Sequence, residues 1–210
     1  MINQQGQQVH ENMQTGTIPQ QLNHGGHEFF DLSEVLSSAI SAMNQYTLVK
    51  DHIKDQELRN ILDRQLAFMQ QEYNTTLESF KTGSKPSVST KTYNMKEDND
   101  FIYGLKPSQP KKPVQSASEL GDQCISFLML NTVKSAAPMK ARAALECTNP
   151  VVRRVLADSV PNCIEMAYEI SLYQNKHHYY QVPQLKQEDM QQLLNSFAPA
   201  QGIQGGNITH

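Results

Sequence analysis

The stretch DQELRNILDRQLAFMQQEYNTTLESF, residues 55–80, decides the fold, because one apolar stripe runs along its whole length. Its apolar side chains recur every three or four residues, which places them on one face of a long helix. Asp55 is a good N-cap for this helix, and Gly83 marks its end. The stripe consists of Leu58, Leu62, Leu66, Met69, Tyr73, Leu77 and Phe80. The opposite face carries Arg59, Asp63, Arg64, Gln70 and Gln71.

A second stretch, NPVVRRVLADSVPNCIEMAYEISLYQ at residues 149–174, follows the same plan 94 positions later. Asn149 takes the N-cap place of Asp55, and Pro150 stands at the first helical position, which proline favours. Each stretch follows another helical segment, so the chain consists of two helix pairs. Two pairs predict an all-α fold, a four-helix bundle.

The expected helices differ in how clearly their inner faces can be read. The third helix is apolar nearly all round at Cys124–Leu130 and should be the most buried. Pro138 is expected to kink or split the third helix, and Pro161 to kink the fourth. The helices are predicted at about residues 31–54, 55–81, 116–147 and 150–180. The inward side chains of the first helix are predicted to be Leu32, Leu36, Ile40, Met43 and Thr47.

The connection over residues 82–115 is long and contains several prolines, which exclude a helix there. Connections of this length are uncommon inside a compact domain and need a reason. A crossover along the length of the bundle would let the third helix run parallel to the second. The expected architecture is therefore a ferritin-like four-helix bundle built from two helical hairpins joined by a long crossover.

The segments outside the bundle are polar. The bundle is assigned to residues 29–185, and residues 1–28 form a flexible polar N-terminal arm rich in Gln, Gly and His. Residues 186–210 contain a short amphipathic segment and a Gly-rich tail. The apolar side chains of the amphipathic segment are Met190, Leu193, Leu194 and Phe197.

Composition excludes several classes of function. A net charge of -3 offers no broad cationic field, so we expect no nucleic-acid partner. No run of apolar residues is long enough to span a membrane, and the start MINQQ is not a signal peptide. The protein is therefore expected to stay in the compartment where it is made. The three cysteines, Cys124, Cys147 and Cys163, are expected to be buried free thiols, with a crosslink to another chain as the alternative.

The helices lack the ligand pattern of a di-metal bundle. Such bundles take one Glu from each of two helices and a Glu-x-x-His motif from each of the other two. No glutamate of the helices is followed by histidine at the third position, and His52 is expected to lie at the surface or at a cap. The glutamates tested are Glu57, Glu72, Glu78, Glu165 and Glu169. We therefore predict no metal, no cofactor, no catalytic residue and an interior filled with hydrocarbon.

Each remaining candidate group has a purely structural interpretation as well as a functional one. The segment His24–Glu28 could hold a soft divalent ion, but a mobile arm also tolerates polar residues. His177 and His178 are adjacent, so both cannot face one metal on a helix. Tyr179 and Tyr180 could form oxidative crosslinks, although closing the end of the bundle is the simpler role. No phosphate-binding or nucleophile motif is present, and no small-molecule substrate is identified.

Several motifs resemble the spore coat protein F family of endospore-forming bacteria, whose members are ferritin-like in fold. The resemblance covers about residues 30–185, and its most specific part is the second hairpin. The motifs are DHIKDQELR at residues 51–59, TNPVVRRVL at 148–156, EMAYE at 165–169 and YYQVP at 179–183. The resemblance implies a structural piece of the spore coat without established catalytic residues. It also implies synthesis in the mother-cell cytoplasm, other coat proteins as partners, and a homo-oligomer.

Two functions of different classes follow. The first is a structural coat component that assembles through protein–protein contacts, and its Gln-rich ends and tyrosines would suit crosslinking. The alternative is a ferritin-like metal-dependent oxidase or peroxide-consuming enzyme with non-standard ligands. A third and weaker idea is a small-molecule or lipid carrier whose pocket is lined by Met43, Met69, Met129 and Met166.

Overall fold

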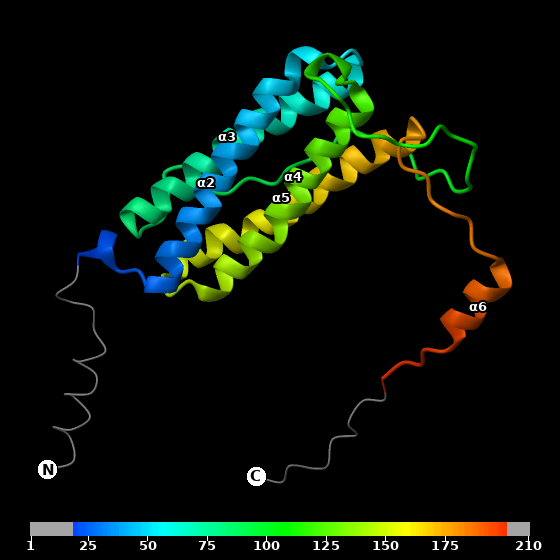
Figure 1. Ribbon diagram of the computed structural model, residues 1–210. Helices are drawn as coiled ribbons and strands as arrows, with labels where there is room; N and C mark the ends of the chain where they lie inside the picture. Colours follow the sequence, from blue (N-terminus) through cyan, green and yellow to red (C-terminus); the bar gives the residue numbers. More distant parts are fainter. Residues whose placement is uncertain (1–18, 201–210) are drawn as a thin grey trace, which may run out of the picture.

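Four long helices lie side by side in the computed structural model, which describes residues 19–200 (Figure 1). The helices are α2 (Gly26–Val49), α3 (Gln56–Thr82), α4 (Asp122–Glu146) and α5 (Pro150–Lys176). Three single-turn elements, η1 (Gln20–Leu22), η2 (Lys50–His52) and η3 (Ala117–Glu119), and the short helix α6 (Gln187–Asn195) complete the described chain. The prediction of an all-α fold is confirmed.

The order of the helices around the bundle follows from their packing. Helix α4 packs on α5 and α2, and α3 packs on α2 and α5, so α3 and α4 are diagonal neighbours. Helices α3 and α4 run in the same direction, because residues 83–121 return along the length of the bundle (Figure 1). The two hairpins are therefore joined by a long crossover.

The caps of α3 and α5 form as their sequences predict. The Asp55 side chain accepts a hydrogen bond from the backbone N–H of Glu57 at 2.8 Å. The Asn149 side chain accepts from the N–H groups of Val151 and Val152 at 2.9 and 3.2 Å. At the end of α3, Gly83 has a φ of 66°, the left-handed conformation that glycine adopts most easily.

Other helix ends differ from expectation, among them the end of α2, which lies at Val49 and not near residue 54. Helix α2 begins at Gly26 instead of near residue 31, because residues 24–28 dock against the bundle. Helix α4 begins at Asp122, since Ser116 provides no side-chain cap and η3 is only a single turn. Helix α5 ends at Lys176, because the chain turns at His178, whose φ is 58°. Pro138 does not split α4, which continues through it.

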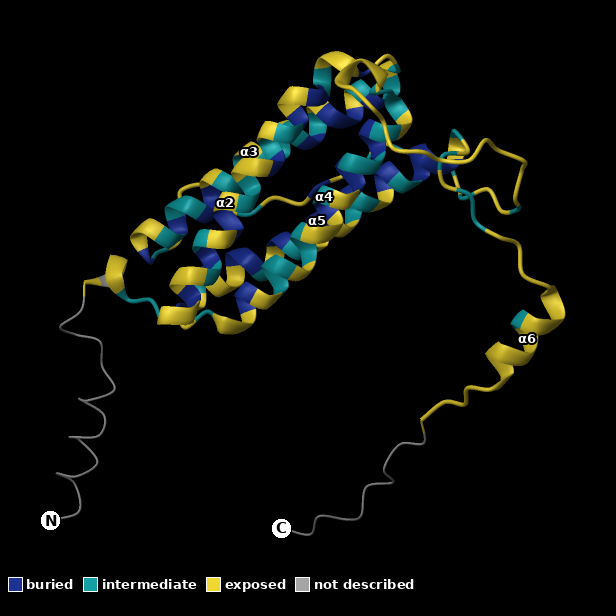
Figure 2. Cartoon of the chain, in the orientation of Figure 1, coloured by how far each residue is buried: buried dark blue, intermediate teal, exposed yellow. Residues whose placement is uncertain are grey.

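The inner face of α2 is rotated relative to the prediction. Leu32 and Leu36 are buried as expected, but Ile40 is 44% exposed and Thr47 is also exposed. Helix α2 contacts both α3 and α4, so the face between those two neighbours is buried instead. That face carries Val35, Ala42, Tyr46 and Val49 (Figure 2).

The stripe of α3 is fully buried only in its first half. Leu58 and Leu62 are fully buried, whereas Leu66, Met69 and the apolar residues after them are half-buried. The buried positions in the rest of α3 are polar, namely Gln65, Thr75, Thr76 and Ser79. The apolar pattern therefore located α3 correctly but did not reveal which of its side chains fill the centre of the bundle.

Replacing Leu62 with alanine should lower the free energy of unfolding by about 2–5 kcal/mol, because the side chain is fully buried in the larger core cluster. Urea denaturation measures this change. Leu48→Ala is the matched control, since Leu48 is 75% exposed and its truncation should cost less than about 0.5 kcal/mol. Equal effects at the two positions would contradict the assigned core.

Candidate functional site

The interior of the bundle contains charged groups, so the prediction of a hydrocarbon-filled centre is wrong. Three glutamates on different helices, Glu28, Glu72 and Glu169, have side chains that are at most 8% exposed. A buried charge is costly unless a charged partner and hydrogen bonds satisfy it. The partners of each glutamate therefore determine what this interior can do.

Glu169 of α5 is surrounded by donors from α3 and the crossover. The Arg64 Nη2 donates to its Oε1 at 2.5 Å, and the Gln65 Nε2 donates to its Oε2 at 3.1 Å. From the crossover, the Tyr93 hydroxyl donates to Oε2 and the backbone N–H of Lys96 donates to Oε1 at 2.9 Å. This carboxylate therefore ties the crossover and α3 to α5.

The tyrosines of this cluster are held in their neutral form. Burial, followed by the hydrogen bond to Glu169, raises the pKa of Tyr93. Burial is also the main cause of the raised pKa of Tyr46, whose hydroxyl donates to the Gln65 Oε1 at 2.9 Å. Burial alone would lower the pKa of Arg64, but Glu169 raises it overall. The cluster thus combines a cation, a carboxylate and neutral phenols.

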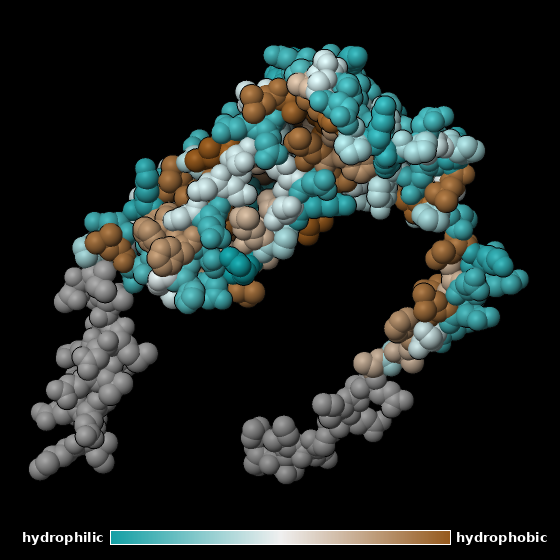
Figure 3. All heavy atoms as spheres, viewed as in Figure 1, coloured by the Kyte–Doolittle hydropathy of each residue, from teal (hydrophilic) through white to brown (hydrophobic). Residues whose placement is uncertain are grey.

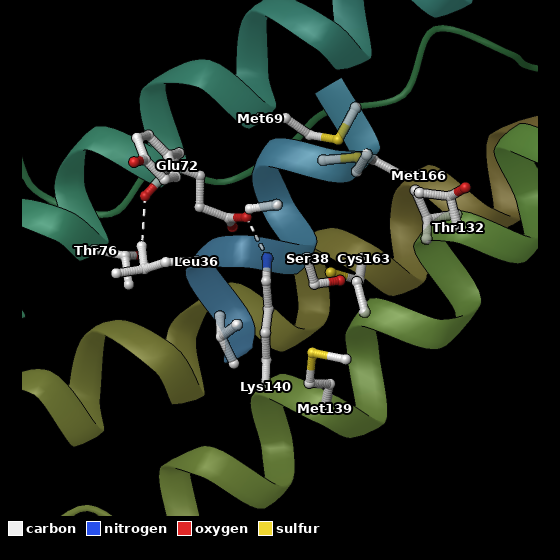
Figure 4. Close-up of a pocket in the computed structure, with 16 residues that line it drawn as sticks. Leu36, Ser38, Met69, Glu72, Thr76, Thr132, Met139, Lys140, Cys163 and Met166 are labelled. Atoms are coloured by element: carbon white, nitrogen blue, oxygen red, sulfur yellow. Dashed lines mark hydrogen bonds and ion pairs between the residues drawn. The ribbon is translucent and has the colours of Figure 1, made fainter. Parts of the chain in front are cut away.

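Glu72 of α3 forms a second buried cluster with α4 and α5 (Figure 4). The Lys140 ammonium donates to its Oε2, and the Asn162 Nδ2 donates to its Oε1 at 3.1 Å. The same Asn162 amide binds the crossover, because its Oδ1 accepts from the Tyr93 N–H at 2.9 Å. Burial would lower the pKa of Lys140, but the charge of Glu72 raises it. Burial raises the pKa of the neighbouring Cys163 thiol, which disfavours the nucleophilic thiolate.

A small cavity of about 50 Å³ lies beside the Glu72–Lys140 pair, between α2, α3, α4 and α5 (Figure 4). Met69 and Met166 line it, as the carrier idea proposed, but Met43 and Met129 do not. Sites for small molecules usually enclose ~300–1,000 Å³. A cavity of this size gives the carrier idea no support.

Residues 24–28 form a third cluster at the opposite end of the bundle from the α2–α3 turn. The His24 Nδ1 lies 2.7 Å from the Glu28 Oε1, and its Nε2 lies 2.9 Å from the Phe80 carbonyl oxygen. The Glu28 Oε2 accepts hydrogen bonds from the backbone N–H groups of Thr148 and Asn149 at 2.8 and 3.1 Å. Burial would raise the pKa of Glu28, but these hydrogen bonds lower it.

This cluster corrects the extent of the flexible arm. Residues 24–28 belong to the bundle, because Glu28 joins the start of α2 to the start of α5. Both ring nitrogens of His24 are hydrogen-bonded, and His27 is exposed, so these histidines are not arranged as a clasp for a divalent ion. Residues 19–23 of the predicted arm are also described, and η1 within them packs on α3. Residues 1–18 of the arm and residues 201–210 of the Gly-rich tail lie outside the described residues.

The end of the bundle near the α2–α3 turn carries carboxylates and bases that partly neutralise one another. The Lys176 ammonium donates to both carboxylate oxygens of Glu57, at 2.9 and 2.8 Å. The His177 Nε2 lies 3.5 Å from the Asp55 Oδ2, whereas His178 lies beyond the end of the helix. Glu97 of the crossover lies against Glu57, and burial followed by this contact raises the pKa of Glu97 to about 7.

The contribution of Glu97 to stability should fall as the pH rises from about 4.5 to about 7, because folded Glu97 holds its proton more tightly than unfolded Glu97. Glu97 binds more protons in the folded state across this window, so it adds a negative term to the slope of unfolding free energy against pH. Urea denaturation of the wild type and of Glu97→Gln at a series of pH values isolates this contribution. The variant cannot ionise at this position and should show a weaker decline, and identical slopes would contradict the prediction.

The glutamates tested for Glu-x-x-His motifs are engaged in protein contacts or lie apart from one another. Glu78 binds the backbone N–H and the hydroxyl of Ser87, at 2.9 and 2.8 Å. Glu165 is partly exposed on α5. Within residues 19–200, no three His, Cys, Asp or Glu side chains lie close enough together to hold a metal ion.

The basic partners are the residues that sequence reasoning missed. Arg64 was assigned to the outer face of its helix, yet its long side chain reaches inward to Glu169. The sequence held one signal for this pairing. Glu169 lies on the same buried face of α5 as Met166 and Ile170. A carboxylate at a core position requires a basic partner.

Comparison with known proteins identifies the family. A family model described as the Coat F domain matches residues 121–183, which include α4 and α5. The spore coat protein F-like protein YhcQ of Bacillus subtilis strain 168 is 57% identical over 186 residues, covering 87% of this chain and 86% of YhcQ. This chain belongs to the spore coat protein F family. The resemblance seen in the sequence motifs is confirmed.

A solved structure supports the fold. The crystal structure of a candidate spore coat protein from Bacillus halodurans C-125 superposes with a TM-score of 0.59 at 17% identity, covering 80% of this chain and 98% of that protein. The likeness at this identity concerns the fold alone. None of the helices within residues 19–200 combines the length and apolarity that crossing a bilayer requires.

Proposed function

We propose that this member of the spore coat protein F family is a structural component of the coat, without catalytic activity, that assembles through protein–protein contacts. One observation carries the proposal. The two carboxylates buried between the helices, Glu72 and Glu169, are each neutralised by a basic side chain, Lys140 and Arg64. Each ion pair joins two helices, so these buried carboxylates hold the bundle together instead of standing free as metal ligands.

Apolar side chains for assembly are present on the bundle surface. Phe30, Leu48 and Leu145 are exposed, and they lie near different helix ends, so each would contribute to a separate contact. The expected partners are other coat proteins and further copies of this chain.

Crosslinking remains part of the proposal. Tyr180 is 42% exposed and is the better candidate for oxidative coupling, because Tyr179 is half-buried. Most of the glutamines of the N-terminal arm lie in residues 1–18, outside the described residues. Mass spectrometry of mature coat material should find linked peptides containing Tyr180, and their absence would count against crosslinking at this position.

Localisation tests the proposed function. A fluorescent fusion of the full chain, expressed from its own promoter during sporulation, should be made in the mother cell and then gather around the developing spore. A fusion that stays diffuse in the mother cell, or that enters the spore interior, would overturn the assignment to the coat.

A further inference from the structure

Helix α6 has an apolar face that its own bundle does not cover. Met190, Leu193 and Leu194 lie at positions i, i+3 and i+4 of α6, and Phe197, two residues past its end, continues the i, i+3, i+4, i+7 spacing of helices that bind in grooves. Leu193, Leu194 and Phe197 are 64%, 68% and 77% exposed. Helix α6 lies apart from the bundle, with its apolar side chains gathered on one side (Figures 1 and 3).

A helix this short needs a surface to pack on. Helix α6 spans nine residues, and isolated helices below ~12–15 residues are marginal in water. No residue of α6 is buried, so its own chain provides little of the packing that would stabilise it. A surface that stabilises α6 would have to offer apolar contacts, a similar length and opposite charge.

Two hollows lie along α4, one between α4 and α2 and one between α4 and residues 109–114 of the crossover. Their volumes are about 540 and 640 Å³, and Cys124 and Phe127 line both, so we call them together the α4 groove. Phe127, Leu128 and Ala42 give the first hollow its apolar area, and most of its other lining residues are polar, such as Gln45, Asn131 and Thr132. Helix α6 rises by about 14 Å along its axis, and α4 rises by about 17 Å from Cys124 to Ser135, so α6 matches the first hollow in length.

The charges of helix and groove are complementary. Glu188 and Asp189 lie in the first turn of α6. Lys111 and Lys112 border one end of the α4 groove, and the Lys111 Nζ lies 4.4 Å from the centre of the Phe127 ring. The one acidic residue that lines this end, Glu119, accepts a hydrogen bond from the Gln115 N–H at 3.2 Å. An α6 placed in the groove would therefore bring its acidic turn to two lysines.

We infer that α6 of one copy binds in the α4 groove of a second copy, and that two copies exchange their α6 helices. The inference rests on the proposed function, because it specifies one contact through which the protein assembles. Val182 is held to the crossover by a 2.8 Å hydrogen bond from the Gly104 N–H, and Pro183 follows it. The short linker from there leads α6 away from its own bundle (Figure 1). Each chain carries both the helix and the groove, so a two-fold pair satisfies both.

Disulfide trapping tests the contact, because the native Cys124 lines the α4 groove. The full chain carrying Leu194→Cys and Cys147→Ser should form a covalent dimer under mild oxidation, seen on a non-reducing gel and reversed by reductant. Adding Cys124→Ser should abolish this dimer. Gln192→Cys, on the polar side of α6, is the matched control and should form much less of it.

Two results would overturn the inference. A disulfide within one chain, seen as a faster-migrating monomer, would show that α6 folds back on its own bundle. Absence of any disulfide to Cys124 would show that the groove is not its binding site. As a second measurement, Leu194→Asp should raise the dimer Kd at least about 30-fold in sedimentation equilibrium, as expected for a hot-spot residue, while Gln192→Asp should leave it nearly unchanged.

The localisation experiment separates this inference from the proposed function. Leu194 is exposed on α6, so Leu194→Asp should leave the bundle folded, which circular dichroism can verify. If the trapping fails while the fusion still gathers around the developing spore, only the α6 contact is wrong. If the fusion does not reach the coat, the proposed function itself fails, whatever the trapping shows.

Discussion

Replacing Glu169 with leucine should lower the free energy of unfolding by about 3–5 kcal/mol, the usual cost of removing one partner from a buried ion pair. The substitution would leave the Arg64 guanidinium without its carboxylate. It would also remove the acceptor of the Tyr93 hydroxyl, the Gln65 amide and the Lys96 N–H. Urea denaturation followed by circular dichroism measures the loss.

Two further variants make this prediction specific. Glu165→Ala changes a partly exposed glutamate of the same helix and should cost less than about 0.5 kcal/mol. Adding Arg64→Met to Glu169→Leu removes the unpaired cation, so the double variant should be more stable than the sum of the single losses predicts. Strict additivity, or a loss below about 1 kcal/mol for Glu169→Leu, would contradict the assigned network.

Replacing Lys140 with methionine should destabilise the protein by a similar amount, about 3–5 kcal/mol. The Glu72 side chain is only 8% exposed and would lose its charged partner while keeping the hydrogen bond from Asn162. Lys134→Met is the matched control, because Lys134 is exposed on the same helix. Thermal and urea denaturation should separate the two variants clearly.

The pair can also be removed as a unit. Glu72→Leu combined with Lys140→Met leaves no unpaired charge between α3 and α4, so much of the lost stability should return. A double variant as unstable as Lys140→Met alone would mean that packing, and not the ion pair, accounts for the effect.

Local sequence signals predicted the fold well where the structure depends on neighbouring residues. The N-caps Asp55 and Asn149 and the left-handed Gly83 form as expected, because each acts within one turn of its own helix. The crossover was also predictable, since its prolines cannot belong to a helix. The start of α4 shows the limit, because it was predicted near residue 116 and lies at Asp122.

Contacts between distant segments were not predictable from local patterns. Glu28 binds Thr148 and Asn149, which are 120 and 121 positions away in the sequence. Nothing near residue 28 therefore indicated that the segment would be buried. The pairing of Arg64 with Glu169 likewise depends on how α3 lies against α5. Helical periodicity assigns a side chain to a face by its Cα position, but a long arginine can reach inward from the border of that face.

We propose that the buried carboxylates of this member of the spore coat protein F family serve the fold and not a metal centre. Metal analysis of the full-length protein, purified without chelators and followed by addition of peroxide, tests it most directly. We expect a stable protein with far less than one metal ion per chain and no change in absorbance. About two iron or manganese ions per chain, as in di-metal bundles, together with an absorbance change on adding peroxide, would contradict it.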